Sequence, residues 1–207
     1  MAQKKSATSR QNFSSFTLAT AMIRVGLAEL TRWDLDAPLL PPSDFFRERL
    51  RRLEVFDLKS SEHSKELLID ACFEEALQGY PALRVWKGAP LQSDELTGLA
   101  DYLIAPRRAY LAGPFVCVVE AKKDDFEKGL AQCLVEMEAC RWNNRQAGLA
   151  RDVYGIVTNG EGWHFYCLTQ NTEVFETPLY TVKNIAEVLG ALSYIASQSV
   201  ANLEAKS

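Results

Sequence analysis

The segment FVCVVEA, residues 115–121, is apolar at every position except Glu120. Near-continuous hydrophobicity of this kind indicates a strand buried on both faces, which requires helices on both sides of its sheet. A helix is expected directly after it, over residues 124–143, because apolar residues recur there at helical spacing: Phe126, Leu130, Cys133, Leu134 and Met137. A strand over residues 153–157 completes a strand–helix–strand unit, which predicts one right-handed crossover.

Periodicity and turn residues predict the remaining elements. Helices are expected over residues 14–30, 44–55 (with Ser43 as its N-cap), 61–77 and 184–201. Strands are expected over residues 83–87, 99–104, 163–168 and 172–180, with a turn at residues 88–90 and a hairpin turn at Asn159-Gly160. The chain is therefore predicted to have an α/β fold, a mixed sheet flanked by helices, in which a helical extension (1–60) precedes the core (61–207).

The composition limits the class of protein. The 207 residues carry a formal net charge of −4 and are 47% hydrophobic, which suits one well-packed domain and counts against a protein that coats DNA non-specifically. No apolar stretch approaches the length of a membrane span, and the N-terminus lacks a signal-peptide pattern. Five scattered cysteines without a CxxC pair are interpreted as reduced thiols. We therefore expect a cytoplasmic protein that does not enter the membrane.

Three charged residues stand out in this apolar setting. Glu120 and Lys122 are two apart on one predicted strand, so their side chains share a face, and Asp101 lies on the preceding strand. Neighbouring carboxylates repel unless a cation separates them, and Mg²⁺ or Mn²⁺ favours oxygen ligands. We expect Asp101 and Glu120 to hold such an ion, with the Ala121 carbonyl as a further ligand. Lys122 would orient or help to deprotonate a water molecule, or stabilise charge on phosphorus.

Other interpretations of the charged residues remain open at this stage. Glu120 and Lys122 can be ordinary strand-end charges, with Asp101 paired to Arg107 or Arg108. The arginines of the predicted helix over 44–55 suit a solvated face, or else a nucleic-acid or subunit contact: Arg47, Arg49, Arg51 and Arg52. A catalytic site for phosphate would need a basic rim, drawn from Lys87, Arg107, Arg108, Lys123 and Arg141. Acidic neighbours would neutralise that rim: Asp124, Asp125 and Glu127.

Four pieces of the sequence, taken in order, resemble a known nuclease superfamily. They are GLADYLI over residues 98–104, VEAKK over 119–123, GLAQ over 129–132, and VTNG over 157–160 with WHFY over 163–166. Together they resemble the PD-(D/E)xK superfamily, the restriction-endonuclease-like fold, and are most similar to the N-terminal nuclease domain of type I restriction R subunits. The resemblance covers roughly residues 61–168, and Ala100 stands where the family usually has proline.

The resemblance implies roles for individual residues. Asp101 and Glu120 would hold the metal, Lys122 would serve the water, and Gln132 would line the site. Gln132 points away from the main apolar stripe of its helix, so this role needs a second buried side, which Val135 and Ala139 could supply; otherwise Gln132 faces solvent. The family also places a glutamate of its first core helix near the metal. Four residues compete for that place, of which the first two are preferred: Glu62, Glu66, Glu74 and Glu75.

The sequence thus supports two functional hypotheses. The first is a divalent-metal-dependent nuclease acting on DNA. The second is a catalytically silent member of the same fold that acts as a binding module or as a subunit of a larger nucleic-acid-processing or restriction complex. In either case residues 14–56 could serve as an oligomerisation or docking arm.

Overall fold

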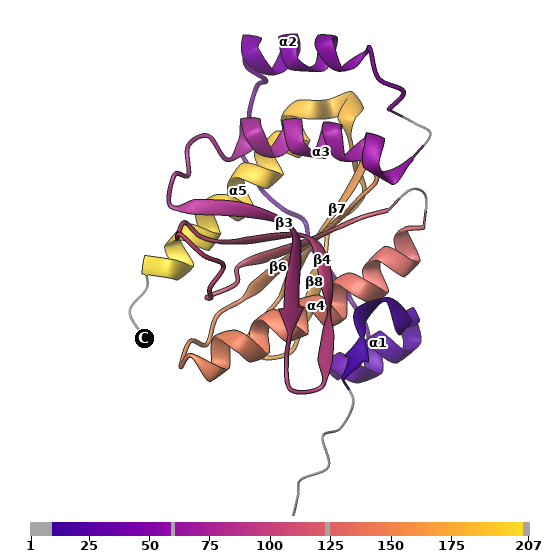
Figure 1. The fold of residues 1–207 in the computed structure, drawn as a ribbon, viewed down its shortest axis with the longest axis vertical. Helices are drawn as coiled ribbons and strands as arrows, with labels where there is room; N and C mark the ends of the chain where they lie inside the picture. Colours follow the sequence, from indigo (N-terminus) through magenta and orange to yellow (C-terminus); the bar gives the residue numbers. More distant parts are fainter. Residues whose placement is uncertain (1–9, 59–60, 123–124, 205–207) are drawn as a thin grey trace, which may run out of the picture.

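The computed structural model describes residues 10–58, 61–122 and 125–204, and its strands form one mixed sheet flanked by helices (Figure 1). The predicted α/β class is confirmed. The central strands lie in the order β3-β4-β5-β6-β7, and β5 and β6 are parallel while the other neighbours are antiparallel. Their bounds are Leu83–Gln92 for β3, Leu96–Pro106 for β4, Cys117–Ala121 for β5, Val153–Thr158 for β6 and Gly162–Leu168 for β7.

Helices cover both faces of the sheet, as the buried central strand requires. On one face lie α3 (Glu62–Ala76) and α5 (Ile185–Glu204), with α2 (Asp44–Leu53) packed on α3. On the other face lies α4 (Phe126–Gln146), which is covered in turn by α1 (Leu18–Val25) (Figure 1). Helix α4 connects β5 to its parallel neighbour β6, so the predicted crossover is present.

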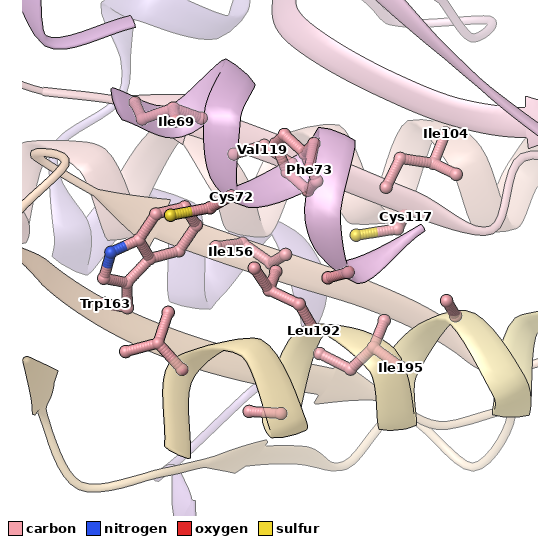
Figure 2. Close-up of a cluster of buried hydrophobic side chains, with 14 of the residues drawn as sticks. Ile69, Cys72, Phe73, Ile104, Cys117, Val119, Ile156, Trp163, Leu192 and Ile195 are labelled. Carbon is pink, nitrogen blue, oxygen red and sulfur yellow. The ribbon is translucent and has the colours of Figure 1, made fainter. Parts of the chain in front are cut away.

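Two hydrophobic cores result, one on each side of the sheet. Figure 2 shows the first, where Ile69 and Phe73 of α3 and Leu192 of α5 meet side chains of the central strands. Trp163 is fully buried there, in T-shaped contact with Phe73. The five cysteines are all free and buried, which agrees with their interpretation as reduced thiols.

The N-terminal segment adds to the sheet. Strand β1 (Gln11–Asn12) pairs with β4, and β2 (Thr31–Arg32) pairs with β8 (Val174–Glu176). The helix predicted over residues 14–30 is shorter than expected: a 3-10 turn (Phe13–Ser15) precedes α1, and Gly26 ends α1 in the left-handed region at φ +84°. Glycine adopts that conformation without steric cost, which explains the early end.

Elsewhere the predicted elements are present, with two corrections to the strands. The turn predicted at residues 88–90 is wrong, because β3 continues through it to Gln92. Pro90 is tolerated because β3 pairs with β4 alone among the described strands and is therefore an edge strand, where proline is found. The strand predicted over 172–180 is two short strands, β8 and β9 (Tyr180–Thr181), linked to α5 by a 3-10 turn (Val182–Asn184). In the part of the chain that the structure describes, no helix is both long enough and apolar enough to cross a membrane.

Candidate active site

Asp101 lies where the β3–β4 hairpin bends. The β3–β4 register runs from Lys87↔Tyr102 to Ala89↔Ala100, so the residue opposite Asp101 is Gly88, in the left-handed region at φ +56°. The buried side of β4 also changes here. Ala100 before Asp101 and Leu103 after it pack into the same core, although strict alternation would place them on opposite faces. The bend therefore turns Asp101 out of the regular ladder.

From this position the Asp101 side chain reaches the end of β5. The last register pair between β4 and β5 is Tyr102↔Val119. Beyond it, the Ala121 backbone N–H donates to Asp101 Oδ2 at 2.8 Å. A carboxylate thus takes over the acceptor role that a strand carbonyl would have at this point, and it lies beside the end of β5.

Glu120 and Lys122 share a face of β5, as their spacing predicts. Lys122 Nζ lies 2.8 Å from Glu120 Oε2, and the Glu120 side chain is fully buried while that of Lys122 is 16% exposed. The backbone N–H of Lys122 donates to the Thr158 carbonyl at 2.8 Å, which extends the pairing of β5 with β6 by one residue. The ammonium group therefore stands between the buried carboxylate and the surface.

Gln132 of α4 completes the group. Its Nε2 donates to Glu120 Oε1 at 2.7 Å and to Glu136 Oε1 at 3.0 Å. Gln132 is buried because α4 is covered on two sides, and Val135 and Ala139 are fully buried as the second buried side requires. The solvent-facing alternative for Gln132 is therefore wrong.

Glu136 was missed by the sequence reasoning. It is fully buried, and its Oε2 accepts no hydrogen bond from the described residues. A signal was present: Glu136 follows Gln132 by one helical turn, so the two share a face of a helix that is otherwise apolar there. Acidic residues on a buried helix face are rare without a partner.

Burial dominates the electrostatics of these acids. It raises the pKa of Glu120 to about 7, and the Asp101 charge acts in the same direction, while the Glu136 carboxyl and Lys122 lower it. Burial also raises the pKa of Glu136 well above its usual range, with the neighbouring Glu120 charge contributing. Both pKa values are raised because the surroundings disfavour the ionised form of each carboxyl group. Both carboxyl groups are therefore protonated more readily than an exposed glutamate.

The glutamates of the first core helix are placed differently. Glu66 Oε2 lies 2.9 Å from Lys87 Nζ, and Glu66 Oε1 lies 2.9 Å from His63 Nδ1. Lys87 also contacts Asp70 at 2.9 Å, on the α3 side of the sheet. Glu66 is therefore engaged by two cationic or potentially cationic side chains. The side chain of the other preferred candidate, Glu62, lies outside the described residues.

The two remaining competitors, Glu74 and Glu75, contact the N-terminal segment. Glu74 forms an ion pair with Arg49, and Glu75 accepts hydrogen bonds from the backbone and side chain of Ser43. Both acids therefore connect α3 to α2.

The donor chemistry of the site suits a hard cation. Asp101, Glu120 and Gln132 offer oxygen atoms, the ligands that Mg²⁺ and Mn²⁺ prefer. Within residues 10–58, 61–122 and 125–204, no three or more His, Cys, Asp or Glu side chains are grouped so that they could hold a metal ion. A metal bound to Asp101 and Glu120 would therefore need other ligands, such as a backbone carbonyl, water or a substrate phosphate.

The cations expected to form a basic rim differ in whether a carboxylate group pairs with them. Lys87 is paired with acids on α3, and Arg141 is buried against Glu138 and Thr172. Lys123 and Asp124 lie outside the described residues. Arg107 and Arg108 are exposed and form no ion pair in the described part of the chain, so the alternative pairing of Asp101 with either is wrong.

Arg84 resembles Arg107 and Arg108 in having no carboxylate partner among the described residues. Arg84 donates to the Arg108 carbonyl at 2.8 Å, and its Cζ lies 5.7 Å from the centroid of the Trp86 ring. No ion pair of Arg84 is formed within the described ranges. We call Arg84, Arg107 and Arg108, together with Trp86, the β3-edge cluster. Trp86 Nε1 is buried and has no hydrogen-bond partner among these residues.

The arginines of α2 contrast with that cluster, because each has a carboxylate partner. Arg47 pairs with Asp44, Arg49 with Glu74, and Arg51 and Arg52 with Glu48. This arrangement is the solvated, self-neutralised face that the sequence allowed as one alternative.

Comparisons with known proteins give a limited result. No protein-family model matches the chain. The chain is similar to Crinkler effector protein 5 of Phytophthora infestans, with 33% identity over 125 residues. That match covers 52% of this chain and 35% of the relative, so the chain corresponds to about a third of the relative's length.

Proposed function

We propose that this chain is a divalent-metal-dependent nuclease of the PD-(D/E)xK type that hydrolyses phosphodiester bonds in DNA. The observation that carries the proposal is the grouping of Asp101, Glu120 and Lys122 at the end of one buried strand. Asp101 is hydrogen-bonded to the residue between the other two, and Glu120 forms an ion pair with Lys122. Two acids and a lysine in this arrangement suit the hydrolysis of a phosphodiester assisted by a metal ion.

The order of the elements supports the same proposal. Helix α3 precedes an antiparallel β3–β4–β5 meander, and α4 then leads to β6, which is parallel to β5. This is the arrangement expected of a restriction-endonuclease-like core. Asp101 lies on the second strand of the meander and Glu120 on the third, which agrees with the roles that the sequence resemblance implies for them.

The residues of this chain would divide the chemistry as follows. Asp101 and Glu120, with the Ala121 carbonyl, would hold the ion, which when bound supplies Lewis acidity and lowers the pKa of a ligated water. Lys122 neutralises Glu120 in the metal-free protein. With the ion on Glu120, the ammonium group is available to orient the water or to offset charge on the phosphoryl group. Gln132 restrains Glu120 from the helix side.

The β3-edge cluster supports nucleic acid as the substrate. Its three arginines have no carboxylate partner in the described residues, so their charge remains available to phosphates. Trp86 pairs in register with Leu103, two residues along β4 from Asp101. At about 3.3 Å per strand residue, the cluster begins roughly 7 Å from Asp101 measured along the strand direction. A DNA strand that follows this edge would therefore pass beside the site.

The alternative is a catalytically silent member of this fold that acts as a binding module or as a subunit of a larger nucleic-acid-processing or restriction complex. Exposed apolar side chains near α2 favour it: Phe45 is 68% exposed, Val55 82% and Phe56 54%. Apolar groups so exposed suit a partner contact, which is also the form in which residues 14–56 would act as a docking arm. The free, buried cysteines suit a cytoplasmic location for either function.

Incubation with single-stranded, duplex and branched DNA in the presence of Mg²⁺ or Mn²⁺ tests the proposal. The variants are Lys122→Ala and, as a matched control, Lys128→Ala, which removes an exposed lysine from the first turns of α4. We expect metal-dependent products from the wild type and the control, and loss of at least about a hundredfold in rate for Lys122→Ala. Absence of cleavage in all substrates, or equal cleavage by the Lys122 variant, would favour the silent alternative.

A further inference from the structure

Glu136 is a buried acid whose presence needs an explanation. It is fully buried in the middle of α4, yet only its Oε1 has a hydrogen-bond donor among the described residues, the Gln132 amide at 3.0 Å. Burying a carboxyl group costs free energy that packing alone does not return. An apolar residue would fill this helix position at lower cost, so a role in the neighbouring site is the natural explanation.

The contact with Gln132 fixes the orientation of an amide. A glutamine amide carries two N–H donors, and Gln132 Nε2 donates to Glu120 Oε1 at 2.7 Å and to Glu136 Oε1 at 3.0 Å. The carbonyl oxygen of the same amide must then face away from both acids. A flipped amide would lose both of these N–H donations.

The free end of that amide is an unused acceptor. No hydrogen bond to Gln132 Oε1 is formed within the described part of the chain, and Gln132 is 8% exposed. The amide is therefore held from one side by two acids and offers its oxygen on the other. Such an oxygen can bind a cation, or can accept a hydrogen bond from a water molecule bound to one.

We propose that Glu136 is a positioning residue that locks the Gln132 amide, so that the amide oxygen is presented to the metal or to its bound water. The inference rests on the proposed function, which it deepens by assigning a role to a residue that does not itself touch the metal. A direct role as a metal ligand is disfavoured, because no group of three carboxylates in the described residues is arranged to hold an ion.

Two substitutions separate the hydrogen bond that Glu136 accepts from the Gln132 amide from the negative charge of Glu136. Glu136→Gln keeps an oxygen acceptor for the Gln132 amide and removes the charge, whereas Glu136→Met keeps the approximate shape and removes the acceptor. Val135→Ala is the control for loosened packing, because Val135 is fully buried next to Glu136 and contacts the hydrophobic core. Urea denaturation establishes that each variant is folded under the conditions of measurement.

The first readout needs no metal. The side-chain amide signals of Gln132, identified by their loss in Gln132→Leu, are followed by ¹⁵N–¹H NMR in the metal-free protein. We expect Glu136→Gln to keep two signals that exchange slowly with water, and Glu136→Met to shift one of them towards its free position. Unchanged signals in Glu136→Met would show that Glu136 does not hold the Gln132 amide in place, and this conclusion would not depend on whether the protein binds metal.

The second readout is the dissociation constant for Mn²⁺, measured by calorimetry. Loss of a residue that orients a metal ligand typically costs about 10–100-fold in metal affinity. We expect a loss in that range for Glu136→Met, and less than about threefold for Glu136→Gln and Val135→Ala. Wild-type affinity in Glu136→Met would overturn the proposal, and so would an equal loss in Glu136→Gln, which would assign the effect to charge. A wild-type protein that binds no Mn²⁺ would contradict the nuclease proposal instead, while the NMR readout would still decide the lock.

Discussion

Asp101 Oδ2 accepts a hydrogen bond from the Ala121 backbone N–H at 2.8 Å, so an acidic side chain closes the β4–β5 ladder where the strands separate. This relationship ties the acid of one strand to the segment that carries Glu120 and Lys122. It also means that Asp101 has a structural role that can be measured apart from catalysis.

The first prediction separates these two roles of Asp101. Asp101→Ala leaves the largely buried Ala121 N–H without this acceptor and is expected to lower the free energy of unfolding by about 1–3 kcal/mol. Asp101→Asn keeps an acceptor oxygen and should lose less than about 0.5 kcal/mol, yet it should lose Mn²⁺ affinity as fully as Asp101→Ala. Urea denaturation and calorimetry measure the two effects. Equal destabilisation by both variants would mean that the hydrogen bond contributes nothing.

The second prediction concerns the ion pair. Lys122→Met removes the cation beside the fully buried Glu120 carboxylate, which leaves an uncompensated charge wherever Glu120 is ionised. The variant should therefore be destabilised by about 1–3 kcal/mol at about pH 8.5, and much less at about pH 5, where Glu120 is protonated. Denaturation in metal-free buffer at both pH values tests this. A loss of equal size at the two values would exclude the ion pair as its cause.

The third prediction follows from the raised pKa of Glu120. Its value in the folded protein is about 7, above the ordinary 4.5, so the folded state binds more protons than the unfolded state between these values. The stabilisation from this group is fully present below about pH 4.5 and is lost as the pH rises through about 7. Glu120→Gln removes the dependence, so its stability relative to wild type should rise from about pH 5 to about pH 8, by the order of 1–3 kcal/mol. A difference that stays constant with pH would contradict the assignment.

The fourth prediction tests how closely α4 approaches the site. A Cβ atom at Gly129 would lie 2.5 Å from Val157 Cγ1 and 3.0 Å from Lys122 Cγ. Gly129→Ala should therefore displace the Lys122 side chain, lower stability by about 1–3 kcal/mol and slow cleavage. Gly79→Ala is the matched control, because nothing lies within 4 Å of its added Cβ. Full activity in Gly129→Ala would show that α4 can shift without disturbing Lys122.

The fifth prediction concerns the β3-edge cluster. Arg84→Ala and Arg108→Ala should weaken DNA binding, and each should reduce the slope of log affinity against log salt by about 1. Arg52→Ala is the control, because Arg52 is paired with Glu48 on α2. Binding is followed by fluorescence anisotropy at several salt concentrations. A larger effect from Arg52→Ala would move the DNA contact to α2.

The sequence predicted those parts of the fold that depend on local pattern. Ser43 is the N-cap of α2, as expected, and accepts a hydrogen bond from its first turn, and β5, α4 and the β6–β7 hairpin follow from apolar periodicity. The turn expected at Gly88 was wrong, because a bend within a paired strand uses the same residues as a turn. The pairing of β1 with β4 and of β2 with β8 depends on tertiary packing, which two-residue strands do not reveal in their sequence.

In the candidate site, too, some features follow from local sequence pattern and others depend on tertiary packing. The shared face of Glu120 and Lys122 follows from strand alternation. The burial of Gln132 required a second covered side of α4, which α1 supplies from a distant part of the sequence. The place of Glu136 could not be fixed without that packing, because a glutamate in a helix is ordinarily exposed.

Anomalous diffraction from crystals grown with Mn²⁺ tests whether Asp101 and Glu120 hold a metal ion, because it locates the ion without reference to activity. We expect a peak within about 2.0–2.6 Å of an oxygen atom of Asp101 and of one of Glu120, with Lys122 Nζ moved away from Glu120. A Mn²⁺ ion bound elsewhere, or an intact Lys122–Glu120 ion pair without bound metal at saturating Mn²⁺, would contradict it.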